Sequence, residues 1–378
     1  MRNHIKWPLF IAALITCALP PALAGRVDVT LSRGVDTTDV DRRAVFALWV
    51  DYLNAEPAAI WTDPDWNAAK SRFWRDFDLT APFVYQTVGD SILSRYEPTV
   101  MAIDEEAEGR FSIRTLFYSE GLEPPADTQN PWAIVRVYAE RVDGEWKLRN
   151  ALGVLTHGWH RPAIGKITFV SRPSHDFDVS RALRSIAFCD SISDIYDFFQ
   201  WDPFDFYITS SREEADEIIG LEYYLDGFQW GHALCSQDIL ISGRGTEWYP
   251  NGLIQMVATG PSLDPHPVVR RGFAGWIGGW DKRSYADNMG EAAEIVAANE
   301  TISFEDYISS DWGVDFAGAQ WFPGAVLCDM VFAARGAEGI KVLFEAGSKL
   351  YEGIESTLGL DRAAFQRAWR QKVLEFSR

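Results

Sequence analysis

The side chains best suited to chemistry in this sequence lie close together, in residues 248–279. Asn251 and Gln255 are four residues apart, so on a helix their carboxamide groups share one face. Arg271 follows in the next apolar segment and adds a fixed positive charge. Carboxamides donate and accept hydrogen bonds, and a guanidinium group binds carboxylates through two parallel hydrogen bonds. These residues predict hydrogen bonding to a polar ligand and capture of a carboxylate group.

The surrounding pattern resembles the active-site region of the gluzincin metallopeptidases. In that family a strand precedes a helix carrying H-E-x-x-H, a connection that often contains His-Pro follows, and the next helix has a Glu-Gly-apolar-Ala pattern. The matching segments here are 248–256 and 266–279, with His266-Pro267 in the connection. The resemblance runs from about residue 200 to the end of the chain. It includes three further expected helices, at 322–334, 339–346 and 365–376.

The sequence departs from the gluzincin motif at every position that carries its chemistry. Asn251 and Gln255 stand where the resemblance implies two zinc-binding histidines. Gly252 stands at the general base and cannot accept a proton, and Arg271 replaces the glutamate that is the third ligand. Carboxamides bind Zn²⁺ weakly, and a guanidinium repels a divalent cation in a poorly solvated cleft. We therefore expect no zinc hydrolysis at this site, and we predict no catalytic residue, metal or cofactor.

Other polar residues nearby have simpler interpretations. His157 and His160 are three residues apart and would bind a metal only with further ligands, so we expect solvated or hydrogen-bonded side chains. Asp202 and Asp205 could form a carboxylate pair in a loop, which indicates little about function.

The second half begins near residue 166, with strands expected at 204–209 and 234–241. A helix is expected over 212–221, capped by Ser210 or Ser211. From about residue 249 onward the pattern is mainly helical. Three acidic residues near the start of the 212–221 helix are expected to be solvated: Glu213, Glu214 and Asp216.

The first half predicts helices followed by antiparallel strands. Thr38 and Asp41 are typical of a helix start, and a second helix is expected from Asp63-Pro64. Alternating apolar residues over 111–117 indicate a strand. Asp143-Gly144 between two strand-like segments predicts a hairpin. The change of pattern indicates an α+β domain over residues 27–155.

The order of these elements resembles the nuclear-transport-factor-like, or SnoaL-like, family. The resemblance rests on two N-terminal helices, the strand Arg110–Tyr118 and the final hairpin at 135–150. It implies a cone-shaped domain around a pocket, and because such domains often pair through their sheets, a homodimer is a further expectation. The pocket candidates are Tyr85, Arg114, Tyr118 and His157. The alternative is that these are ordinary sheet residues with satisfied partners.

Charge and targeting signals restrict the class of protein. With 54 acidic and 35 basic residues the net charge is −19, which argues against binding to nucleic acid or to an anionic membrane surface. Residues 1–24 have a basic start, a short apolar run and a small-residue site at Ala22-Leu23-Ala24, the layout of a secretory signal peptide. A lipid anchor on Cys17 is the minor alternative. We expect a periplasmic or secreted protein, and no later stretch is apolar and long enough to span a membrane.

Three cysteines would remain after cleavage, at positions 189, 235 and 328. One pair could be bridged in an oxidising compartment, and the sequence does not say which. The alternative is that Cys189, Cys235 and Cys328 are buried thiols.

Together these patterns predict an α+β protein. A cone-shaped domain of helices and a curved antiparallel sheet, 27–155, would precede a mainly helical gluzincin-like domain with a small sheet, 166–378. We expect an exported, non-catalytic pseudopeptidase that binds a peptide, a cell-wall fragment or another exported protein. The first alternative is lyase or isomerase chemistry in the N-terminal pocket. The second, less favoured, is a metallohydrolase with atypical ligands.

Overall fold

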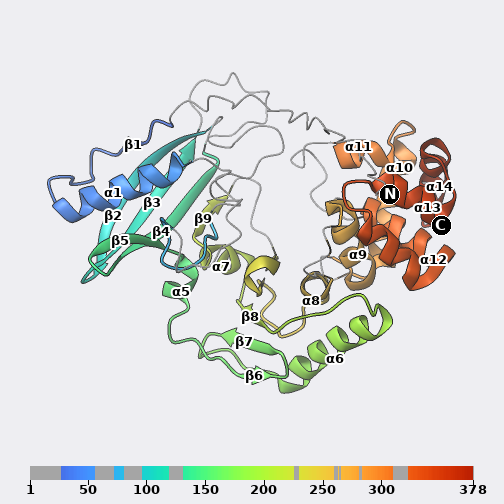
Figure 1. The fold of residues 1–378 in the computed structure, drawn as a ribbon, viewed down its shortest axis with the longest axis horizontal. Coiled ribbons are helices and arrows are strands. Elements are labelled where there is room, and N and C mark those ends of the chain that lie inside the picture. The colour runs from blue at the N-terminus through green and yellow to red at the C-terminus, as the bar shows by residue number, and fades with distance from the viewer. Residues whose placement is uncertain are drawn as a thin grey trace, which may run out of the picture.

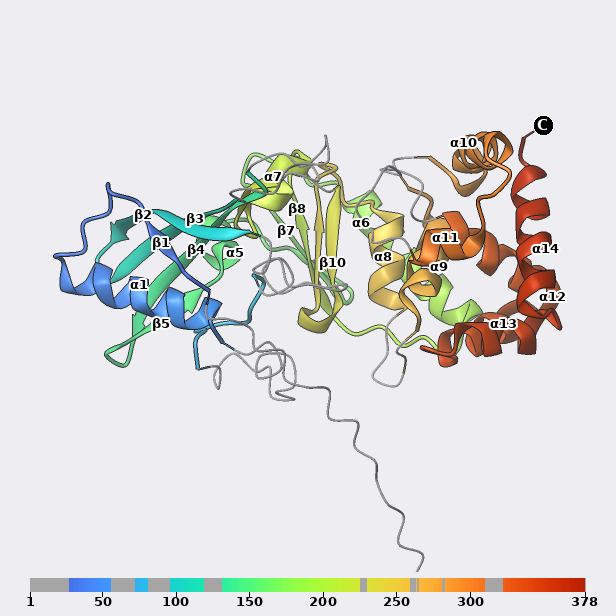
Figure 2. The same cartoon turned by 90° about the horizontal axis from the view of Figure 1, so that it is seen from above.

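The fold is α+β, as expected. The computed structural model describes residues 27–55, 72–80, 96–118, 131–224, 230–258, 263, 265–280, 283–309 and 322–377. Figure 2 shows the first sheet at one end of the molecule, the second sheet in the middle and the C-terminal helices at the other end. Tyr85, Cys17, the expected signal peptide and the start of the helix expected from Asp63 lie outside the described residues.

The first sheet has the strand order β1-β2-β3-β4-β5. Strand β9 pairs with β4 at residues 133–135, on the stretch that β5 does not reach. These strands are β1 Thr30–Leu31, β2 Glu97–Ala107, β3 Arg110–Tyr118, β4 Ala133–Val142, β5 Glu145–Arg149 and β9 Leu221–Tyr224. The turn between β4 and β5 consists of Asp143 and Gly144, both with positive φ, which confirms the predicted hairpin.

Helix α1, Val40–Leu53, covers the apolar face of this sheet (Figure 1). Trp49 and Leu53, four residues apart on one helix face, are both buried. The helix start differs from the prediction. Asp39 is the N-cap and accepts from the backbone N–H of Arg42 at 2.8 Å, whereas the hydroxyl of Thr38 donates to Asp36 at 2.7 Å.

The second sheet has the order β10-β11-β8-β7-β6. Its strands are β6 Ala163–Ile164, β7 Ile167–Ser171, β8 Phe204–Ile208, β10 Gly231–Leu234 and β11 Ile239–Ser242. The three central strands are parallel, and the two edge strands are antiparallel to their neighbours. The strand expected over 234–241 is two strands, because Asp238 adopts a left-handed conformation and turns the chain between β10 and β11.

Helices flank the second sheet and continue to the C-terminus. The helix expected over 212–221 ends early, because Leu221 already begins β9. The described helices after α1 are α5 Ala151–Leu155, α6 Val179–Ile195, α7 Arg212–Glu217, α8 Pro250–Val257, α9 Pro267–Gly278, α10 Tyr285–Ala298, α11 Phe304–Ser309, α12 Phe322–Glu345, α13 Leu350–Leu358 and α14 Arg362–Leu374. Among them, none has the length and apolar character needed to cross a membrane.

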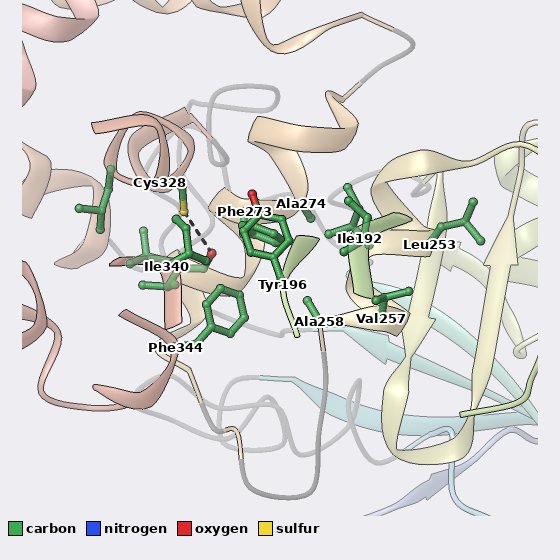
Figure 3. Packing of buried hydrophobic residues seen from close by; sticks show 14 of the residues in the cluster. Ile192, Tyr196, Leu253, Val257, Ala258, Phe273, Ala274, Cys328, Ile340 and Phe344 are labelled. Carbon is green, nitrogen blue, oxygen red and sulfur yellow. Dashed lines mark hydrogen bonds between the residues drawn. The ribbon is translucent and has the colours of Figure 1, made fainter. Parts of the chain in front are cut away.

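The helices expected over 322–334 and 339–346 are the two parts of α12, which is interrupted at Gly336. A buried core joins α6, α8, α9 and α12 (Figure 3), with aromatic side chains at its centre. The rings of Tyr196 and Phe273 lie 5.1 Å apart, and those of Phe273 and Phe344 lie 5.4 Å apart. This packing holds the start of α8 against the end of α9, where the candidate site lies.

The two halves of the chain share a second core. Val45 of α1 and Ile113 of β3 belong to the same buried cluster as Tyr207 and Ile241 of the second sheet. Because β9 also extends the first sheet, the second half contributes directly to the fold of the first. The division at 155 and 166 stays a prediction.

Candidate functional site

Asn251 and Gln255 face each other on α8, as their spacing predicts. The side-chain amide of Gln255 donates to the side-chain oxygen of Asn251 at 2.9 Å. Asn251 is buried, and its own amide donates to the backbone carbonyl of Gly279 at 2.8 Å. Helix α8 begins here because Pro250 occupies its first position, where the missing N–H costs no hydrogen bond.

Packing leaves no room for a side chain at Gly252, the residue that the proposed gluzincin resemblance places at the general base. Gly252 is buried and lies against the ring of Tyr249 and the side chain of Leu240. A Cβ atom at Gly252 would lie 2.5 Å from the Tyr249 ring and 2.6 Å from Leu240. A glutamate at this position would displace both neighbours.

Arg271 lies on the neighbouring helix α9 and is half-buried. Burial and the adjacent Arg270 lower the pKa of the Arg271 guanidinium below its ordinary value. His266 caps α9 by accepting from the N–H of Val268 at 3.3 Å, and burial lowers the pKa of its ring, which favours the neutral form. His266 therefore has a capping role here.

The thiol of Cys235 lies beside these helices. It donates to the backbone carbonyl of Gln255 at 3.4 Å. Burial raises the pKa of the Cys235 thiol, and the nearby charge of Arg270 opposes this. All three described cysteines, Cys189, Cys235 and Cys328, are free thiols. Within the described ranges no three His, Cys, Asp or Glu side chains come together as metal ligands.

Strand β10 forms the edge of the second sheet next to α8. Among the described strands it pairs with β11, so it is an edge strand of this sheet. All four of its residues are partly exposed. Gly231 permits the close approach of Tyr249, whose ring would lie 2.8 Å from a Cβ atom at this position. The edge strand and α8 are in direct contact.

The N-terminal candidates lie in ordinary environments where the structure describes them. Arg114 forms an ion pair with Glu222 of β9, with Nε 2.8 Å from the carboxylate. Tyr118 ends β3 and is paired in register with Glu97, and His157 is exposed in the turn after α5. An ion-paired, partly exposed Arg114 fits the alternative that these are sheet residues with partners.

Buried carboxylates at the ends of the parallel strands were not expected. Asp216 is fully buried and hydrogen-bonded to His232, and Glu214 is buried and bonded to Arg172 and Ser210. The interpretation of these two acids as solvated is wrong, whereas Glu213 is exposed. The available signal was the Ser211-x-x-Glu214 capping spacing. No local sequence pattern indicated the burial of Asp216, because its partner His232 is distant in the chain.

A second unexpected pair joins the loops before α6 and α8. Glu247 is fully buried, and its carboxylate bonds the ring of His175 at 2.7 Å and the backbone N–H of Asp178 at 3.0 Å. These bonds tie the start of α6 to the loop that leads into α8. They help to fix where α8 begins.

Asp202 and Asp205 have different surroundings. Asp205 is ion-paired with Arg161. Asp202 lines a shallow hollow of about 580 Å³ together with Asp190, Asp194 and Lys166. The structure does not favour a shared carboxylate site for Asp202 and Asp205.

The N-terminal half of the chain contains acidic side chains whose burial no sequence pattern predicts. The hydroxyl of Tyr52 donates to Asp78 at 2.7 Å, and both residues are buried. Asp76 accepts from the backbone N–H of Asn150 at 3.1 Å, and burial raises its pKa to about 6. A carboxyl group with this pKa can exchange protons near neutral pH.

Comparison with known protein families and with curated protein sequences found no match for this chain. Both family resemblances therefore rest on the residues quoted above.

Proposed function

We propose that this protein is an exported, non-catalytic pseudopeptidase that binds peptides or other extended partners in a gluzincin-like cleft. The observation that supports this most is the hydrogen-bonded chain from Gln255 through Asn251 to Gly279. The groups that replace the zinc ligands bond to one another and to the backbone. They hold α8 against α9 without a metal.

The lack of a proton-accepting side chain at Gly252 supports a binding role in place of hydrolysis. Gly252 has no proton acceptor, and its neighbours fill the space that a side chain would need. Peptide hydrolysis also requires an activated water, which zinc would supply in the active relatives that the sequence resembles. Asn251, Gln255 and Arg271 are weak or repulsive partners for that ion.

The edge of β10 provides a mode of binding. An extended peptide can add to an unpaired sheet edge through backbone hydrogen bonds, largely independently of its sequence. Among the described strands, β10 lies at the edge of the second sheet and contacts α8. A cell-wall fragment or a folded exported partner would use the side chains of the cleft instead.

Amide hydrogen exchange of the full mature chain, with and without a pool of random hexapeptides, tests this proposal. We expect slower exchange in β10 and unchanged exchange in β6, which is the edge strand at the opposite side of the same sheet. Mass spectrometry of the recovered peptides should find them intact. Cleaved peptides, or equal exchange in β10 with and without peptide, would contradict the proposal.

A second candidate function is lyase or isomerase chemistry in the N-terminal domain. It is favoured by Asp76, whose pKa of about 6 suits a general base, and by the buried Tyr52–Asp78 pair. It ranks second because aromatic side chains fill the space between α1 and the sheet, where the rings of Trp49 and Tyr52 stack at 5.2 Å. Deuterium uptake at the α-carbon of small ketones, lost in Asp76→Asn, would support it.

A further inference from the structure

Five arginine side chains gather on the face of the first sheet opposite to α1. Along β3, Arg110 and Arg114 alternate with residues such as Ile113, which lies in the buried core that α1 covers. The register of the sheet places Arg136 of β4 directly opposite Arg114, and Arg149 of β5 on the same face. A fifth arginine, which lies before β2 in the chain, joins them through a shared ion-pair partner. We call this set the arginine face: Arg75, Arg110, Arg114, Arg136 and Arg149.

The five guanidinium groups of the arginine face share two carboxylates. Glu140 of β4 is buried and pairs with three of them: Arg75, Arg110 and Arg149. Glu222 of β9 pairs with the other two, Arg114 and Arg136. Guanidinium groups that converge on one carboxylate repel one another, so this arrangement leaves positive charge without a counter-charge.

The arginine face is also short of hydrogen-bond acceptors. The Nε atoms of Arg110 and Arg136 are buried and have no hydrogen-bond partner among the described residues. Arg114 and Arg136 stand directly opposite each other on neighbouring strands, where like charges destabilise a sheet. Three acids lie beside the face and pair with none of its arginines in the described part of the chain: Asp76, Asp104 and Glu106. An arrangement that costs stability in this way is typical of a surface that serves binding.

We propose that the arginine face is a docking surface for an extended acidic segment of a partner protein. Arg110 belongs to the group of arginines around Glu140. Arg114, four residues further along β3, belongs to the group around Glu222. Four residues of a strand span about 14 Å, so two carboxylates four residues apart in an extended segment along β3 would meet one group each. Each would be bound through paired N–H···O hydrogen bonds.

Charge complementarity favours an acidic partner over a second copy of this chain. The chain has a net charge of −19, so a local excess of arginine is an exception on its surface. Two arginine faces placed against each other would bring like charges together. All five side chains are partly exposed, so a partner can reach them. This surface lies on the first sheet, apart from α8 and β10, so the inference goes beyond the proposed function.

Fluorescence anisotropy with labelled peptides tests the inference on the full mature chain. The probe carries two Glu residues four positions apart among Gly, Ser and Thr, and both of its ends are blocked. We expect it to bind about tenfold more tightly than the same peptide with Gln in place of Glu. It should also bind more tightly than a peptide whose two Glu residues are adjacent. High salt should weaken the binding, because the charges are exposed.

Arg75 and Arg141 provide a matched pair of variants. Their side chains are 48% and 49% exposed, and each pairs with one carboxylate, but Arg141 pairs with Asp41 of α1 on the other side of the sheet. Arg75→Gln should weaken binding of the Glu peptide about threefold or more, whereas Arg141→Gln should leave it unchanged. Arg114→Lys should keep part of the affinity because its charge remains. Thermal unfolding confirms that each variant is folded, and Arg114→Lys carries the test if Arg75→Gln is not.

Three outcomes would overturn the proposal. The first is equal affinity of the Glu and Gln peptides, or equal loss in Arg75→Gln and Arg141→Gln. The second is equal affinity of the peptide with adjacent Glu residues, which would contradict the two-group geometry. The third is self-association that is lost in Arg75→Gln without any peptide binding, which would assign the face to a second copy. The exchange experiment on β10 is independent of all three, so failure here leaves the proposed function in place.

Discussion

The side-chain amide of Gln255 donates to the side-chain oxygen of Asn251 at 2.9 Å, and the proposed gluzincin resemblance places both residues at the positions of zinc-binding histidines. In a gluzincin, two histidines at this spacing bind one zinc ion. Here the carboxamides satisfy each other, and Asn251 also bonds Gly279 beyond the end of α9. Asn251 therefore links α8 to the C-cap residue of α9.

Removal of Asn251 should destabilise the fold. Asn251→Ala leaves the buried carbonyl of Gly279 and the amide of Gln255 without partners, so we expect a loss of about 1–3 kcal/mol in the free energy of unfolding. Gln255→Ala should cost less, about 1 kcal/mol, since Gln255 is partly exposed. Urea denaturation measures both. An Asn251→Ala variant as stable as the parent would show that the hydrogen bonds of Asn251 with Gln255 and Gly279 contribute nothing to stability.

Gly252 should not tolerate a side chain. Gly252→Ala forces Tyr249 and Leu240 apart, and we expect a destabilisation of about 1–3 kcal/mol. Gly290→Ala in α10 is the matched control, because no atom lies within 4 Å of the added Cβ and alanine favours helix. That variant should be more stable by about 0.5–1 kcal/mol. Equal stability of the two alanine variants in the same denaturation series would refute the packing argument.

Local elements could be predicted where short-range chemistry decides them. Asp143-Gly144 forms the hairpin because both residues accept positive φ, and strand Arg110–Tyr118 follows its alternating pattern. Pro250 and Pro267 mark the starts of α8 and α9. These signals depend on neighbours within a few residues, so they can be recognised without the fold.

Contacts between distant residues could not be predicted in this way. Asn251 bonds Gly279, and Asp216 bonds His232 across the boundary between α7 and β10. Each contact depends on how the elements pack, which no local pattern contains. The shortened α7 has the same origin, because pairing of Leu221 with Val135 of β4 ends the helix.

Asp216 and Glu213 should respond differently to substitution. Asp216→Ala leaves His232 without its buried partner, and we expect a loss on the order of 3 kcal/mol. Glu213→Ala removes an exposed carboxylate from the same helix turn and should change stability by no more than about 0.5 kcal/mol. Thermal or urea unfolding distinguishes the pair. Similar small effects of both would restore the interpretation of a solvated helix start.

The free energy of unfolding of the protein should fall as the pH rises toward neutrality because of Asp76. Burial raises its pKa to about 6 from 3.8, so between these values the folded protein holds a proton that the unfolded chain has released. The stability contributed by this group is present below the lower value and is lost as the pH rises through about 6. The full change is about 3 kcal/mol.

Asp76→Asn removes this dependence. The variant should gain stability relative to the parent between pH 4 and 7, measured by urea denaturation at intervals of about one pH unit. Asp104→Asn, an exposed residue of β2, is the control and should follow the parent. Parallel profiles of Asp76→Asn and the parent would contradict the pKa of Asp76.

The zinc content of the protein tests the central claim most directly. The full mature chain is purified without a chelator, incubated with Zn²⁺, desalted and analysed by mass spectrometry, with Gln371→Ala as a control for Gln255→Ala. We predict less than about 0.1 equivalent of zinc, because carboxamides and a guanidinium do not hold this ion. One equivalent of zinc that is lost in Gln255→Ala and kept in Gln371→Ala would contradict the account and favour a metallohydrolase with atypical ligands.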